Sequence, residues 1–169
     1  MPFTPFHFGP GAAVHAVAPR HVSFLAFCAA NVLIDVETLY FLVTHQHPWH
    51  RFFHTFIGAS LVAAATVLLF LAARRAAPAL KLPNLFAWQE LSALSVALGA
   101  ALGVYSHVVL DSMMHADVRP FAPFSAASPL FHVVPLGFLH GLCVALGVGG
   151  LALLGLRSVL RSSRRPVGR

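Results

Sequence analysis

Apolar residues occur in four long runs along the chain, and polar residues gather between them. The runs cover residues 22–43, 54–73, 91–112 and 132–156. Each is long enough to cross a hydrocarbon core of about 30 Å as a helix. A fifth apolar stretch, residues 7–18, is shorter, with Pro10 near its start and Pro19 after its end. The pattern predicts an all-α integral membrane helical bundle, with four transmembrane helices and a short N-terminal half-span or re-entrant helix.

Composition supports this fold class. The chain is 58% hydrophobic and only 9% charged, whereas soluble domains average about 25% charged residues. The two cysteines, Cys28 and Cys143, fall in separate predicted spans and indicate no disulfide framework. We therefore expect a single transmembrane helical domain over residues 1–156, followed by a basic cytoplasmic tail over residues 157–169 that contacts anionic headgroups. The oligomeric state is left open.

The basic residues are distributed unevenly between the two sides of the predicted bundle. The formal net charge is +6, but the cations lie in short loops and at the C-terminus, so we expect membrane lipids and no nucleic acid as partners. One side carries nine of them: Arg20, Arg74, Arg75, Lys81, Arg157, Arg161, Arg164, Arg165 and Arg169. The other side has only Arg51 and Arg119. The positive-inside rule makes the first side cytoplasmic.

Histidine and aspartate side chains collect in one layer, toward the predicted outer face. "HRFFH" spaces His50 and His54 four residues apart, and "HVVLD" does the same for His107 and Asp111. On a helix this spacing places two side chains on one face, where they can chelate an ion. Asp35 lies in the outer half of the first span, where an ionised carboxylate is costly without a partner. Nitrogen and oxygen donors without thiolate suit Zn²⁺, with Mn²⁺ or Fe²⁺ as alternatives.

Other interpretations of the same residues stay open. His50 and His54 can be interfacial side chains of an aromatic belt, and His107 with Asp111 can be a buried pair that ties helices together without metal. Asn31, four residues before Asp35, is expected to support a ligand from behind. His15, His21 and His45 are expected to face water or headgroups, and His132 and His140 are second choices for the site, all by their positions in the runs.

Several motifs together resemble a known family. These are "MPFTPFHFGPG" at the start, the aspartate of the first span, "HRFFHTFIGA", and "GVYSHVVLDSMMHADVRPFAPFS". Over residues 1–140 they resemble the inner-membrane-associated metal-dependent hydrolases described as LexA-binding. The resemblance implies a bacterial-type inner membrane and metal ligands at His7, Asp35, His50, His54, His107 and Asp111. It leaves open which of His50 and His54 binds, and whether His115 is an added ligand. The ligand order is also similar to zinc-dependent phospholipase C.

The hydrolase resemblance implies a mechanism. A divalent ion would activate water and polarise a phosphoryl or acyl oxygen. Asp35 or Asp111, whichever is less committed to metal, would be the general base. Arg119 would hold a phosphate or anchor the chain at the interface. The expected substrate is a lipid or lipid-linked phosphoester. Two other functions remain: metal or proton transport, and a non-catalytic scaffold fastened by metal.

Overall fold

The computed structural model describes residues 6–163, with side chains described up to residue 160. Over this range helices are the only regular secondary structure, as predicted. The elements are α1 (Phe8–Val17), α2 (Phe24–Val43), α3 (Phe56–Ala76), the 3-10 helix η1 (Leu85–Glu90), α4 (Ala93–Met114) and α5 (Leu136–Ser163). Four helices, α2, α3, α4 and residues 136–160 of α5, are long and apolar enough to cross a membrane. The 10 residues of α1 reach only about half-way across.

Three of the long helices start two residues later than the apolar runs predict, because a hydroxyl side chain caps each start. Ser23 precedes α2, Thr55 precedes α3 and Ser92 precedes α4. Each side chain accepts a hydrogen bond from the backbone N–H three residues ahead, which satisfies one of the unpaired donors of a helix start. Helix α5 begins at Leu136, directly after Pro135, and continues past Arg157. Residues 157–163, expected in the tail, are therefore helical, and residues 164–169 lie outside the described range.

Helices α2, α3 and α4 pack around a shared apolar core. Ile34, Val62 and Val104 lie in it, each less than 5% exposed. Helices α2 and α4 approach closely because α4 presents glycines to α2: a Cβ on Gly103 would lie 2.7 Å from the Phe27 carbonyl oxygen. Small residues at such positions let the backbones of membrane helices come together.

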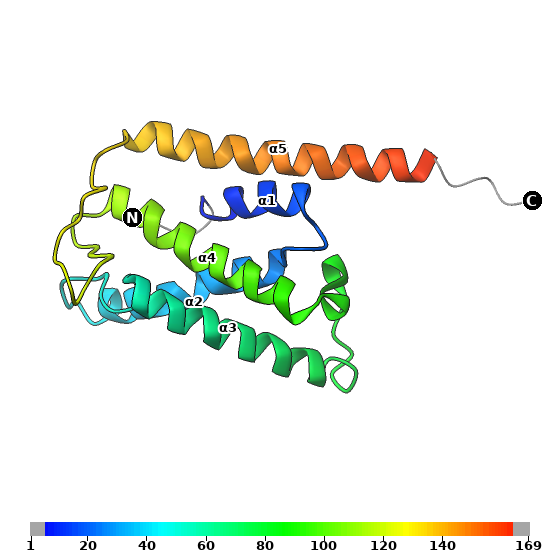
Figure 1. Cartoon of the computed structure of the whole chain (residues 1–169), viewed down its shortest axis with the longest axis horizontal. Helices are drawn as coiled ribbons and strands as arrows, with labels where there is room; N and C mark the ends of the chain where they lie inside the picture. The colour runs from blue at the N-terminus through cyan, green and yellow to red at the C-terminus, as the bar shows by residue number, and fades with distance from the viewer. Residues whose placement is uncertain (1–5, 164–169) are drawn as a thin grey trace, which may run out of the picture.

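Helix α1 lies alongside α5, on which it packs most extensively, and it also packs on α2 (Figure 1). Gly150 of α5 is so close to α1 that a Cβ there would lie 2.7 Å from the carbonyl carbon of Ala12. Further along, the Arg157 guanidinium donates a hydrogen bond to the Ala16 carbonyl. The predicted half-span helix is thus held inside the bundle by α5.

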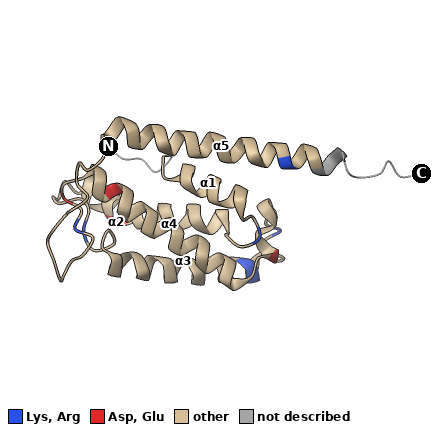
Figure 2. Ribbon diagram, turned by 45° about the horizontal axis from the view of Figure 1, so that its top comes forward, with Lys and Arg blue, Asp and Glu red and all other residues tan. Residues whose placement is uncertain are grey.

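Large apolar side chains cover much of the outer surface of the bundle. Leu68, Leu94 and Leu151 are each more than 60% exposed. Such a surface is suited to lipid, and the chain is a helical membrane protein. The few charged residues lie toward the two ends of the bundle and on the C-terminal part of α5 (Figure 2).

Candidate metal centre

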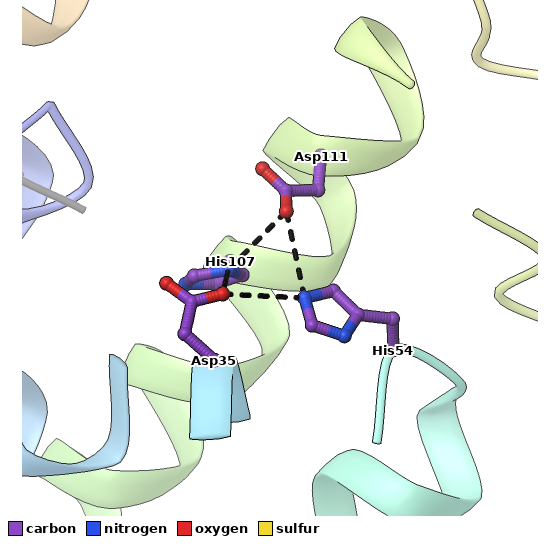
Figure 3. Close-up of side chains that lie close together, drawn as sticks. All are labelled: Asp35, His54, His107 and Asp111. Carbon is purple, nitrogen blue, oxygen red and sulfur yellow. Dashed lines mark ion pairs between the residues drawn. The ribbon is translucent and has the colours of Figure 1, made fainter. Parts of the chain in front are cut away.

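The six predicted metal ligands lie together at the end of the bundle where α2 and α4 finish. They come from the residue before α1, from α2, from the segment between α2 and α3, and from α4: His7, Asp35, His50, His54, His107 and Asp111. Five of the six are less than 4% exposed, while the side chain of Asp35 is 22% exposed. Figure 3 shows four of them pointing toward one another.

Four of these side chains form what we call the inner group: Asp35, His54, His107 and Asp111. The Nε2 atom of His107 lies 3.2 Å from Asp35 Oδ1 and 3.3 Å from Asp111 Oδ2. The Nε2 atom of His54 lies 3.6 Å and 3.5 Å from the same two oxygens (Figure 3). The predicted (i, i+4) pair on α4, His107 with Asp111, is therefore in contact.

A second set of donors, the outer group, consists of His50, His115 and Asp111. The Nε2 atom of His50 lies 3.7 Å from Asp111 Oδ2. The ring of His115 stacks on that of His50 with centroids 4.6 Å apart. Asp111 belongs to both groups and is also approached by His7, whose Nε2 lies 3.3 Å from Asp111 Oδ1.

Two of the imidazoles are oriented by a polar partner on their other nitrogen. Nδ1 of His107 lies 3.0 Å from the Asn31 side-chain oxygen, and the Asn31 amide nitrogen donates to the Phe27 carbonyl. This fixes the amide, so Nδ1 of His107 is the donor and Nε2 faces the carboxylates. Nδ1 of His50 similarly meets Asp117 Oδ1 at 3.0 Å. Such outer partners are the usual support of a metal-binding histidine. Asn31 was expected to support a predicted ligand, and its side chain contacts His107.

The segment that carries His50 and His54 is not helical, contrary to the helical spacing predicted for the two residues. Residues 50–55 precede α3, which begins at Phe56. Carboxylates hold this segment by its backbone: Asp117 accepts the N–H groups of Trp49 and His50, and Glu37 accepts that of Phe53 at 2.7 Å. The two imidazoles still meet, with centroids 4.7 Å apart.

The donor distances of the inner group fit a bound ion better than direct hydrogen bonds. Charge-assisted N–H···O bonds are typically about 2.7–2.9 Å long, whereas the four separations here are 3.2–3.6 Å. Two ligands of one tetrahedral Zn²⁺, each about 2.0–2.2 Å from the ion, lie about 3.4 Å apart. Both oxygens of Asp111 and the Nε2 atoms of His54 and His107 are buried without a hydrogen-bond partner among the described residues. The cluster can therefore hold a metal ion.

The protonation states outside the spans are partly favourable to metal binding. Burial lowers the pKa of His50, and the neighbouring His54 lowers it further. Burial raises the pKa of Asp117, but the charge and hydrogen bonds of His50 lower it more, so the net shift is downward. At neutral pH this leaves His50 neutral and Asp117 ionised. Burial lowers the pKa of His54, but Asp111 and Asp35 raise it above its usual value. A proton and a cation therefore compete for its Nε2.

A cavity of about 580 Å³ lies beside the outer group. Its lining is largely apolar, with His50, Asp117, Arg51 and Arg119 among the polar residues. Arg51 is engaged locally: its Nε donates to the Pro48 carbonyl at 2.9 Å and its guanidinium lies over the Phe41 ring. The exposed guanidinium of Arg119 has no ion pair or hydrogen bond within residues 6–163. It is the cation that the cavity offers to a ligand.

The remaining histidines stand apart from the two donor groups. His21, His45 and His132 are exposed, as expected for the first two. His140 stacks on Phe6. The expectation that His15 faces water or headgroups is wrong. It is 5% exposed, and its Nδ1 lies 3.2 Å from the Val22 carbonyl, because the end of α1 folds back against the start of α2.

Sequence reasoning missed Asp117. It lies in a loop two residues after His115, where neither helical spacing nor the cost of a buried charge marks it. Its only local signal is the "HAD" triplet that follows the predicted ligands. No protein-family model, no curated protein and no solved structure matches the chain.

Proposed function

We propose that the chain is a membrane-embedded metal-dependent hydrolase that acts on a phosphoester bond of a lipid or lipid-linked substrate. The observation that carries this proposal is the inner group, whose nitrogen and oxygen donors are 3.2–3.6 Å apart and include orphaned buried atoms. Perturbed, buried ionisable groups within a membrane span are typical of functional sites. The resemblance to inner-membrane metal-dependent hydrolases supports the reaction class.

The donor set favours Zn²⁺, with Mn²⁺ and Fe²⁺ as alternatives, because it consists of imidazole nitrogens and carboxylate oxygens. When bound, such an ion lowers the pKa of its water to about 7 and polarises a phosphoryl oxygen. His7, whose ring stacks on that of His107, would hold Asp111 through its Nε2, which lies 3.3 Å from Asp111 Oδ1.

Of the two carboxylates considered as general base, Asp35 is the stronger candidate. Asp111 is 1% exposed at its side chain and is approached by His7, His50, His54 and His107. Asp35 is 22% exposed, and a general base must pass its proton on to solvent or product. Asp35 would therefore be the carboxylate that can give up its place as a ligand of the inner group and accept the proton, while Asp111 stays ionised as a ligand.

The cavity beside His50 supports a substrate with both an apolar and an anionic part. Its lining combines apolar side chains such as Phe52 and Pro123 with the Arg119 guanidinium. A guanidinium matches the geometry of a phosphate. A phospholipid headgroup or a lipid-linked phosphate has this combination of groups, and it would enter from the membrane surface.

The proposed location is a bacterial-type inner membrane, with the centre near the outer face and the C-terminus in the cytoplasm. Arg74 and Arg20 support this orientation. The Arg74 guanidinium donates to the Leu91 carbonyl, and the Arg20 carbonyl accepts from the Ser95 hydroxyl. Both contacts lie near the start of α4, at the end opposite Asp111. Positive charge at that end favours a cytoplasmic position.

A non-catalytic scaffold is the second candidate, because Asp111 is approached from the residue before α1, from α4 and from the segment before α3. The test is to purify the chain in lipid nanodiscs, measure bound metal by mass spectrometry, and assay hydrolysis of phosphodiester and phosphomonoester lipids. We expect at least one equivalent of metal and metal-dependent turnover, both lost in Asp111→Asn. The control is His132→Ala, an exposed imidazole of the same outer region. Bound metal without turnover on any substrate of the panel would favour the scaffold.

A further inference from the structure

Asp111 is shared by two donor groups. The second group contains two buried imidazole nitrogens, on His50 and His115, that the residues of the first group do not satisfy. We propose that the centre holds two divalent ions bridged by Asp111, one in the inner group and one held by His50, His115 and Asp111. This inference rests on the metal site of the proposed function and adds a second ion, its ligands and its position relative to the substrate.

The inner group has no place for the remaining imidazoles. Its two nitrogens and two oxygens already complete the four ligands of a tetrahedral ion. The Nε2 of His50, 3.7 Å from Asp111 Oδ2, and that of His115 are both buried without a hydrogen-bond partner in the described part of the chain. Buried polar atoms without partners are costly. A second cation between the two rings and Asp111 would satisfy them.

The fold also presents these two imidazoles as ligands. Asp117 binds His50 through both its backbone N–H and its Nδ1, which turns Nε2 toward Asp111. His115 follows the last turn of α4, and its backbone N–H donates to the Asp111 carbonyl at 2.8 Å. His107 and Asp111 of α4, and His115 directly after it, thus follow each other at four-residue steps toward the end of the bundle.

The two ions would differ in function because their protein ligands differ in number. Four protein ligands close a site, whereas three leave a position for water or substrate. The outer group has three, and one of them, His50, lines the cavity together with Asp117 and Arg119. The outer ion is therefore the one that faces the substrate. Paired ions about 3.5–4 Å apart are a recurrent arrangement for phosphoester cleavage.

The test is metal stoichiometry and magnetic coupling after the metal-free protein, in nanodiscs, is reconstituted with Mn²⁺. We expect about two Mn²⁺ per wild-type chain and an exchange-coupled electron paramagnetic resonance signal. His115→Ala and His50→Ala should bind about one Mn²⁺ each and give the spectrum of an isolated ion. His132→Ala, the matched control, should keep both ions and the coupled signal.

One Mn²⁺ in the wild-type chain, or a coupled pair that persists in His115→Ala, would overturn the inference. Thermal unfolding of each variant checks that the fold is retained, and the wild-type spectrum decides the question if both variants unfold. The outcome is separable from that of the proposed function. Two coupled ions without hydrolysis would overturn only the hydrolase proposal, and one ion with turnover intact in His115→Ala would overturn only the second ion.

Discussion

Asp117 and His50 are joined by a 3.0 Å contact between Asp117 Oδ1 and His50 Nδ1, although 67 positions separate them in the chain. The same carboxylate accepts the backbone N–H groups of Trp49 and His50. It therefore fixes both the position of the segment before α3 and the direction of the His50 ring. The partner of the non-ligating nitrogen commonly decides how well an imidazole binds metal.

Replacing this carboxylate should weaken metal binding without removing a ligand. For Asp117→Asn we expect about a 10- to 100-fold loss of affinity, the range typical of lost outer partners. Competition with a chromophoric chelator measures the affinity. Glu90→Gln is the control, since Glu90 lies at the opposite end and bonds Asn84. Equal affinities in Asp117→Asn and wild type would show that His50 needs no such support.

Arg119 should act on substrate binding and not on metal content. Because charged hydrogen bonds contribute about 1.5–3 kcal/mol, Arg119→Ala should raise KM for a phosphate-bearing lipid about 10- to 100-fold and leave bound metal unchanged. Arg119→Lys should recover part of the loss. Arg75→Ala, an exposed cation at the other end, is the control. An unchanged KM in Arg119→Ala would make this residue an interfacial anchor.

Removing metal should lower stability by a defined amount. A ligand present at about 100 times its Kd stabilises the folded state by about 2.7 kcal/mol. Chelation of the metal from the loaded protein should lower the free energy of unfolding by about this amount. Addition of Zn²⁺ should restore it. In Asp111→Asn the same treatment should have no effect. Denaturant titration in detergent micelles measures both, and equal chelator sensitivity of the two proteins would place the metal elsewhere.

The close contact of α2 with α4 makes a separate prediction on stability. A Cβ on Gly99 would overlap the Ser23 carbonyl, whereas one on Gly141 of α5 has no atom within 4 Å. We expect Gly99→Ala to destabilise the fold by about 1–3 kcal/mol, as overpacking typically does, and Gly141→Ala to be nearly neutral. Unfolding of the two variants side by side compares them. Equal stability would mean that α2 and α4 can separate at no cost.

Much of the fold follows from the apolar pattern because span length and helix period are local properties. The four long helices and the short α1 appear where expected, and the contact of His107 with Asp111 follows from one turn of α4. Helix starts shifted because capping by a hydroxyl is decided by a single side chain, such as Thr55.

The residues that position the donor side chains could not be predicted from the sequence in the same way. Asp117 and Glu37 reach the segment before α3 from distant parts of the chain, and long-range contacts of loop residues leave no periodic signal. The same contacts replace the helix predicted around His50. These long-range contacts also decide which of His50 and His54 approaches Asp111. In the structure both imidazoles approach it.

The described side chains of helix α5 belong to neither donor group, yet α1 packs on α5 at Gly150 and at Arg157, which donates a hydrogen bond to the Ala16 carbonyl. His7 is the residue directly before α1. A sideways shift of α5 would carry α1 with it and withdraw this imidazole from Asp111. A change in bilayer thickness, or a neighbouring protein that displaces α5, would in this way change the surroundings of the Asp111 carboxylate.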